Sequence, residues 1–274
     1  MFATFDGRTV DLAELVSFEI VAGVAIFCRF GAMMTAAPGF SDGSVSPRAR
    51  LAAALAVTAA LAPTLAGAYP SFGPAPAMAP LAGLLFTELL IGGFLGLLAR
   101  AFVSALNVAG QIIALQMGLS LAQIFDPTNQ LQGAIVGGFF AIVGVALIFA
   151  TDLHHGLLLA VKGSYAAFPP GAPVRFDGGV GVDFAAAMVE AVNEGFALGA
   201  RLAAPFVVFG LVFYAGVGVL NRLIPQAQVF FMLAPANLVL GLALLMTTVG
   251  LMMTVFLEEF AAFLAGLRTI GGPL

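Results

Sequence analysis

The sequence predicts an all-α integral membrane protein with about six to eight hydrophobic helices arranged in hairpins. Hydrophobic residues make up 61% of the 274 residues and charged residues only 9%, whereas soluble domains carry roughly 25% charged residues. Several uncharged stretches are long enough to cross a hydrocarbon core of about 30 Å. The connections between them are short, so we expect one membrane-embedded unit without a separate soluble domain.

Seven apolar stretches are the candidate helices, and proline marks the main breaks between them. The stretches are 20–37, 51–68, 81–99, 101–125, 131–151, 202–221 and 238–267. Four prolines make 69–80 an extended linker, and 154–183 is predicted to be the longest polar connection. Pro225 and Pro235 predict a turn before the last helix. Arginine and lysine occur at both ends of the predicted bundle, so the positive-inside rule leaves the orientation open.

Ionisable side chains interrupt these apolar stretches at Arg29, Glu88, Glu190 and Glu194. A charge at the bilayer centre costs at least about 2.5 kcal/mol, so such groups normally face protein or water. We expect these four to be paired or to face a partner subunit. For Glu88 a structural pairing is favoured, and a proton-relay role is the alternative. Glycines four residues apart also favour close helix packing, and they occur at 92 and 96, 133 and 137, and 195 and 199.

A polar and irregular stretch, MGLSLAQIFDPTNQ at 117–130, lies between two apolar segments. With 3.6 residues per turn, Asn107 and Gln111 share one helix face, whereas Gln116 and the polar residues after it fall on roughly the opposite face. A straight helix with one polar side does not produce that change. We therefore expect a break near Gly110 or Gly118, and a second break at Asp126–Pro127, because proline restricts the residue before it.

Irregular backbone at membrane depth is tolerated only where protein buries it or water lines it. The stretch is thus a candidate re-entrant or pore-lining loop, and a plain connector between helices is the alternative. Methionine and phenylalanine side chains repack around varied shapes, which suits a seal. The plug or gate candidates are Gln116, Met117, Gly118, Leu119, Ser120, Leu121, Gln123, Ile124, Phe125, Asp126 and Pro127.

An ordered set of motifs resembles the FliR family of flagellar biosynthesis proteins, the membrane subunits of the type III protein-export gate. The motifs are FCRFGAMMTAAPGF (27–40), PRAR (47–50), ELLIGGFLGLL (88–98), GQIIALQMGLSLAQIFDP (110–127), TDLHHGLLLAVKGSYAAFPPG (151–171) and APFVVFGLVFYAGVGVLNRLIPQAQVFF (204–231). No single motif is decisive, but together they cover nearly the whole chain in the same order.

The resemblance implies a non-enzymatic subunit that forms and seals a channel for unfolded flagellar proteins in the bacterial inner membrane, within the flagellar basal body. Residues 1–200 would be a FliP-like part whose loop at about 110–130 is a plug. Residues 201–274 would be a FliQ-like hairpin that turns at Arg222, Pro225 and Gln226. The implied partners are FliP-like and FliQ-like subunits and FlhB-like and FlhA-like export components. An injectisome export gate and a small-solute secondary transporter are the alternatives.

Enzymatic chemistry finds little support in the sequence. The sequence suggests a metal site at Asp152, His154 and His155. However, adjacent histidines on a helix point about 100° apart, and the sequence has no other histidine to complete a ligand shell. Ser120 lacks a recognisable base and oxyanion site. No phosphate-binding loop is present, and the net charge of −4 gives no nucleic-acid footprint. We expect no metal, no cofactor and no nucleic acid.

Overall fold

The computed structural model describes residues 2–5, 8–41, 43, 45–69, 78–119, 131–171, 180–224 and 229–269. Over these residues the chain is predominantly helical, which confirms the all-α prediction. A small antiparallel hairpin at the N-terminus, formed by β1 (Phe2–Phe5) and β2 (Arg8–Asp11), is an addition that the sequence analysis missed.

Eight α-helices and one 3-10 turn follow in the described residues. They are α1 (Leu12–Ala36), α2 (Pro47–Leu65), η1 (Ala66–Ala68), α3 (Met78–Val103), α4 (Ala105–Gln116), α6 (Leu131–Ala150), α7 (Leu153–Ala167), α8 (Val180–Leu223) and α9 (Val229–Thr269). By length and composition five helical stretches can cross a membrane, or six if the bent pair α6–α7 is one span. The chain is therefore an all-α integral membrane protein.

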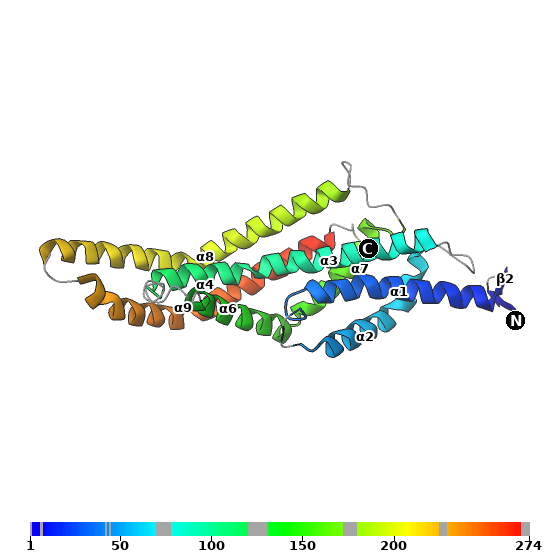
Figure 1. The fold of residues 1–274 in the computed structure, drawn as a ribbon, viewed down its shortest axis with the longest axis horizontal. Coiled ribbons are helices and arrows are strands. Elements are labelled where there is room, and N and C mark those ends of the chain that lie inside the picture. The colour runs from blue at the N-terminus through cyan, green and yellow to red at the C-terminus, as the bar shows by residue number, and fades with distance from the viewer. Residues whose placement is uncertain are drawn as a thin grey trace. The chain divides into compact units, whose positions relative to one another are not determined.

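Contacts divide the chain into two units, and the first consists of residues 1–100, 153–189 and 263–274. Within it α1 packs along α2 and contacts α7, and Figure 1 shows α1 and α2 side by side. Gly92 and Gly96 of α3 lie against the main chain of Arg29 and Met33 of α1, where a larger residue would collide with backbone. These two glycines, singled out from their spacing, allow α3 to approach α1 closely.

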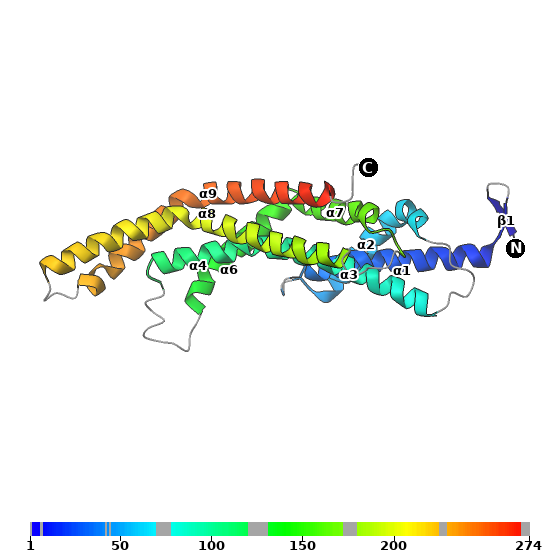
Figure 2. The ribbon, with the colours of Figure 1, turned by 90° about the horizontal axis from the view of Figure 1, so that it is seen from above.

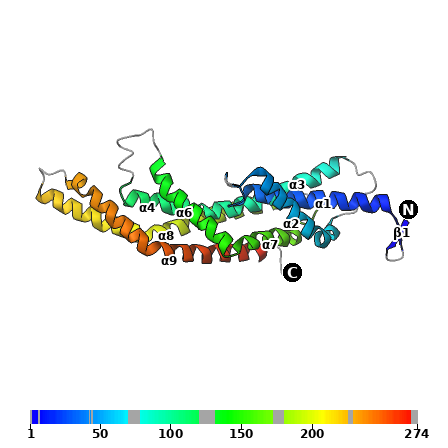
Figure 3. The same cartoon turned by 90° about the horizontal axis from the view of Figure 1, so that it is seen from below.

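The second unit consists of residues 101–152 and 190–262. Its closest helix pair is α4 with α6, which lie side by side in Figures 2 and 3. The two backbones meet at Gly110 and Gly137, where a Cβ on Gly110 would overlap the main chain of α6. Gly199 of α8 packs in the same way on Ala105 of α4. Glycine contacts therefore set the helix spacing in this unit too.

One predicted boundary was misplaced and one predicted connection was wrong. The stretches 81–99 and 101–125 were predicted to be separate helices, and α3 and α4 are separate, but the break lies at Ser104, and 78–116 together counts as one candidate span. Arg100 does not end the helix, because arginine is a good helix former. The supposed polar connection 154–183 contains α7, whose apolar side chains Leu157, Ala160 and Val161 are buried.

The last two helices are also longer than predicted. Helix α8 begins at Val180 and α9 at Val229, well before the predicted starts at residues 202 and 238. Pro205 and Pro235 lie inside these helices, although proline removes one backbone hydrogen bond. Tertiary packing thus overrides the local preference for a break. Hydrogen bonds from Arg201 to Glu259 and from Asn237 to Tyr214 join the two helices, which lie side by side in Figures 2 and 3.

Candidate functional site

The end of α4 is the described part of the predicted plug segment. The helix stops at Gln116, and Gly118 adopts a φ of 77°. The Gly118 N–H donates to Leu115 O at 3.1 Å, and the Leu119 N–H donates to Ala114 O at 3.0 Å. This pair of bonds is a Schellman motif, in which glycine takes the left-handed position after the helix. The predicted break therefore occurs near Gly118, while Gly110 lies inside the helix.

The side chains of Gln116 and Met117 lie against two glycines of α8 and α9. Met117 is 1% exposed, and a Cβ on Gly241 of α9 would come within 2.5 Å of its Cγ. A Cβ on Gly210 of α8 would collide with the carboxamide of Gln116. Glycine at both positions leaves the space that these two side chains fill.

Asn237 of α9 fixes the same point through hydrogen bonds. Its side chain is buried, and its Nδ2 donates to the main-chain oxygen of Gln116 at 3.1 Å and to the Tyr214 hydroxyl at 3.3 Å. Its Oδ1 has no hydrogen-bond partner in the described part of the chain. A buried acceptor left open costs about 1–3 kcal/mol. We call the group Gln116, Met117, Gly210, Tyr214, Asn237 and Gly241 the α4 seat.

Only four of the plug candidates belong to the described residues: Gln116, Met117, Gly118 and Leu119. The other candidates lie outside them, namely Ser120, Leu121, Gln123, Ile124, Phe125, Asp126 and Pro127. Their role as a plug, and the break at Asp126–Pro127, stay predictions.

In the first unit, Arg29 and Glu88 form a buried ion pair between α1 and α3. Both side chains are at most 1% exposed. Arg29 Nε donates to Glu88 Oε2 at 2.5 Å, and Nη2 donates to Glu88 Oε1 at 3.0 Å. This two-pronged geometry is the strongest form of an arginine–carboxylate contact. The two charges thus neutralise each other inside this unit.

Arg29 makes two further hydrogen bonds. Nη1 donates to Ser164 Oγ at 3.0 Å, and Nη2 donates to Phe168 O at 3.0 Å. The guanidinium carbon lies 3.8 Å from the ring centre of Tyr165, a cation–π contact. The Tyr165 hydroxyl in turn meets that of Tyr69 at 3.1 Å. We call Arg29, Tyr69, Glu88, Ser164 and Tyr165 the arginine cluster; it connects α1, α3, α7 and the residue after η1.

The other predicted charges behave differently. Glu190 and Glu194 are exposed on α8, and no ion pair to either is found in the described residues. Around them lie the exposed apolar side chains Val189, Val192 and Phe196. Of the predicted hairpin turn, Arg222 is exposed at the end of α8, and Pro225 and Gln226 lie outside the described residues.

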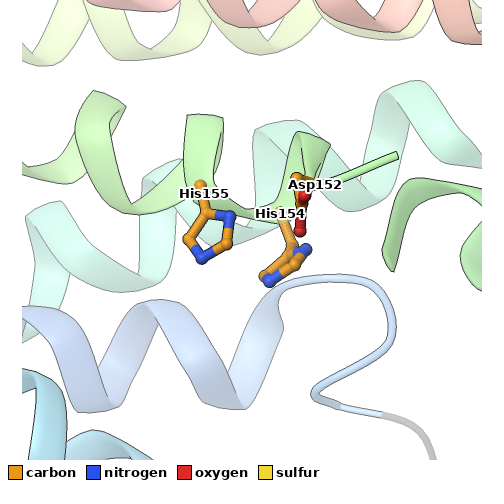
Figure 4. A group of neighbouring side chains, drawn as sticks. All are labelled: Asp152, His154 and His155. Atoms are coloured by element: carbon orange, nitrogen blue, oxygen red, sulfur yellow. The ribbon is translucent and has the colours of Figure 1, made fainter. Parts of the chain in front are cut away.

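Asp152, His154 and His155 lie close together in the sequence and in space, where α6 ends and α7 begins. Figure 4 shows both imidazole rings beside the Asp152 carboxylate. The ring centres are 4.1 Å apart, closer than a 100° separation on a helix suggests. The potential ligand atoms all lie within 4.8 Å of one another, whereas a structural zinc site takes four protein ligands. The absence of a metal here stays a prediction.

Sequence reasoning missed Asn237, Tyr214, Tyr69, Tyr165 and Ser164. For Asn237 a signal was present, because it is an amide within the uncharged run 223–257, and polar groups in apolar spans often mark function. For the glycines of the α4 seat no signal was available, since spacing does not reveal which side chain approaches them.

Comparisons with known proteins agree with this architecture. Residues 20–263 match the family model described as "Bacterial export proteins, family 1". The flagellar biosynthetic protein FliR of Caulobacter vibrioides is 36% identical over 254 residues, which cover 92% of this chain and 98% of that protein. FliR of Escherichia coli is 29% identical, with 79% of this chain and 80% of that protein covered. FliR of Bacillus subtilis is 25% identical, with 68% and 71% covered.

The match extends over most of the chain, from α1 to α9, and includes both the arginine cluster and the α4 seat. The chain therefore belongs to bacterial export proteins, family 1, and within it to the FliR family of flagellar biosynthetic proteins.

Proposed function

We propose that this chain is a non-enzymatic subunit of the flagellar type III protein-export gate, in which it forms and seals a channel for unfolded flagellar proteins. It acts in the bacterial inner membrane, at the flagellar basal body, with FliP-like and FliQ-like subunits and with FlhA-like and FlhB-like export components. Membership of the FliR family is the observation that carries this proposal.

The surface of α8 supports an assembly with partner subunits. Glu190 and Glu194 stand one turn apart on a helix that is apolar enough to span a membrane, with exposed apolar neighbours. Two like charges on such a face are costly against acyl chains. A neighbouring subunit that brings arginine or lysine, or water in a channel, would remove that cost. We assign this face to a partner subunit.

The α4 seat supports the sealing role. Helix α4 ends at Gln116, and the left-handed φ of Gly118 turns the backbone out of the helical path. Contacts from α8 and α9 hold Gln116 and Met117 at this end. Non-helical backbone needs protein or water around it at membrane depth. A loop rooted there, with Leu121, Ile124 and Phe125 at its centre, would close a pore and still adapt to varied cargo.

Co-purification tests the assembly. Extraction in a mild detergent is expected to recover the chain together with two other small hydrophobic proteins, identified by mass as FliP-like and FliQ-like. Glu190→Lys combined with Glu194→Lys is expected to abolish this recovery, because it places two more cations against a cationic partner. Glu19→Lys, an exposed carboxylate at the start of the first span, is the matched control. Recovery of the wild type as a metabolite-binding monomer contradicts the proposal.

Conductance tests the seal. Deletion of residues 118–126 is expected to raise ion conductance of the purified assembly in a planar bilayer at least several-fold. Replacement of the same residues by glycine and serine keeps the loop length and should also leak, since the apolar side chains are lost. Unchanged conductance in both variants, with the subunits still recovered together, removes the sealing role.

A further inference from the structure

We propose that Asn237 is a positioning residue that holds the C-terminal end of α4, and thereby the start of the segment that follows, against α8 and α9. The geometry of this anchor stands on the described residues alone. Its consequence, control of the seal, rests on the proposed function.

Asn237 satisfies a backbone group that the helix cannot satisfy itself. The last four carbonyls of an α-helix have no partner within the helix, and Gln116 provides one of them because α4 ends there. Asn237 Nδ2 donates to this oxygen at 3.1 Å across 121 residues of sequence. The bond defines the amide orientation, because a flipped side chain would place two acceptors against each other. Asn237 therefore caps α4 from another helix.

Steric contacts converge on the same two residues. Met117 fills the space over Gly241 of α9, and Gln116 fills the space over Gly210 of α8. Tyr214 of α8 accepts from the same Asn237 amide at 3.3 Å, which keeps that amide directed at α4. The Asn237 hydrogen bonds and the close contacts at Gly210 and Gly241 thus hold the same part of the chain, the last turn of α4.

The anchor uses only one side of the Asn237 amide. Asn237 Oδ1 is buried without a hydrogen-bond partner in the described part of the chain. An open acceptor raises the free energy of this arrangement, so the amide holds α4 less strongly than a fully paired amide would.

Thiol labelling of the assembled complex tests the anchor. Cys28, the single cysteine, is first removed as Cys28→Ser, and Leu119→Cys then reports access to the start of the segment after α4. We expect Asn237→Leu to speed maleimide labelling of that probe at least several-fold. Thr247→Val is the matched control, because Thr247 is a polar residue of α9 that bonds only to carbonyls of its own helix. An unchanged labelling rate in Asn237→Leu overturns the proposal.

A second variant tests the anchor without touching Asn237. Gly241→Ala places a methyl group against Met117 and is expected to speed labelling as well. Combining it with Met117→Ala should restore part of the wild-type rate, because the shorter side chain relieves the collision. Additive effects of the two substitutions would contradict the seat.

Conductance distinguishes a failure of the Asn237 anchor from a failure of the proposed sealing function. Faster labelling in Asn237→Leu, with conductance unchanged both there and in the 118–126 deletion, supports the anchor and contradicts the sealing function. Unchanged labelling with a leaking deletion overturns the anchor and leaves the sealing function standing.

Discussion

The arginine cluster and the α4 seat are both buried polar groups in an apolar protein, but they differ in how completely they are paired. Every nitrogen of the Arg29 guanidinium donates to a partner, and its charge meets a carboxylate. Asn237 uses its amide nitrogen twice, and its oxygen has no hydrogen-bond partner among the residues that the structure describes. Buried polar networks stabilise one arrangement when fully satisfied and weaken it when partly satisfied.

This difference indicates which of the two groups is held more firmly. The arginine cluster joins three helices of its unit at one point, and any displacement would expose a charge to apolar surroundings. The α4 seat holds a single helix end by one amide and two glycine contacts. We therefore infer that the arginine cluster is the more rigidly held of these two buried groups.

The largest expected effect comes from breaking the ion pair. Glu88→Leu leaves Arg29 buried without a counter-charge, and loss of one partner of such a pair costs about 3–5 kcal/mol. We expect little folded protein in a membrane preparation, measured by detergent-resistant assembly and by the midpoint of thermal inactivation.

The control for this variant removes both charges. Arg29→Met with Glu88→Leu replaces the pair by apolar groups, a change that is often neutral, and should restore assembly. Export activity in the double variant also tests the alternative for Glu88. If that variant folds but exports nothing, a proton-relay role for Glu88 gains ground over the structural one.

A loss of stability of intermediate size is expected at the contact between α4 and α6, where the two backbones meet directly. Gly110→Ala would push a methyl group into the backbone of α6 at Gly137, and overpacking of this kind costs about 1–3 kcal/mol. Gly138→Ala is the matched control, since nothing lies within 4 Å of a Cβ there. Equal thermal midpoints for the two variants would show that α4 and α6 are not held at this distance in the assembly.

The sequence was sufficient for the fold class and for the groups that stand out in an apolar chain. Arg29 and Glu88 could be identified from the sequence because a charged side chain within a membrane span is costly and normally has a partner. Their mutual contact was not predictable, since 59 residues separate them and only the packing of α1 on α3 brings them together. The same applies to Gly210 and Gly241, whose importance depends on which side chain reaches them.

The missed helix α7 shows a different limit. Pro169, Pro170, Pro173 and the glycines around them made 154–183 look like a polar connection, and the five apolar residues at 157–161 were given too little weight. In the fold, Leu157 and Val161 face the core while Lys162 is only partly buried. A short amphipathic helix that packs inside a unit does not resemble a membrane span, so a search for spans passes over it.

The smallest effect is expected at the edge of the arginine cluster. Tyr69→Phe removes the hydroxyl contact to Tyr165, and a neutral hydrogen bond contributes about 1 kcal/mol. A double-variant cycle with Tyr165→Phe measures that contact directly. Burial raises the pKa of the Tyr69 phenol above its ordinary value of 10.0, so the folded chain keeps a proton that the unfolded chain loses above about pH 10.

Stability should therefore fall as pH rises above 10 in the wild type, and less steeply in Tyr69→Phe. Below that pH the phenol is neutral in both states, and the two proteins should differ by a constant amount. Thermal midpoints from pH 7 to pH 11 provide the measurement. A difference that is constant up to pH 11 would mean that water reaches Tyr69 in the assembly. The arginine cluster would then be hydrated at Tyr69. In that case it would differ less from the α4 seat in how completely its polar groups are paired within the protein.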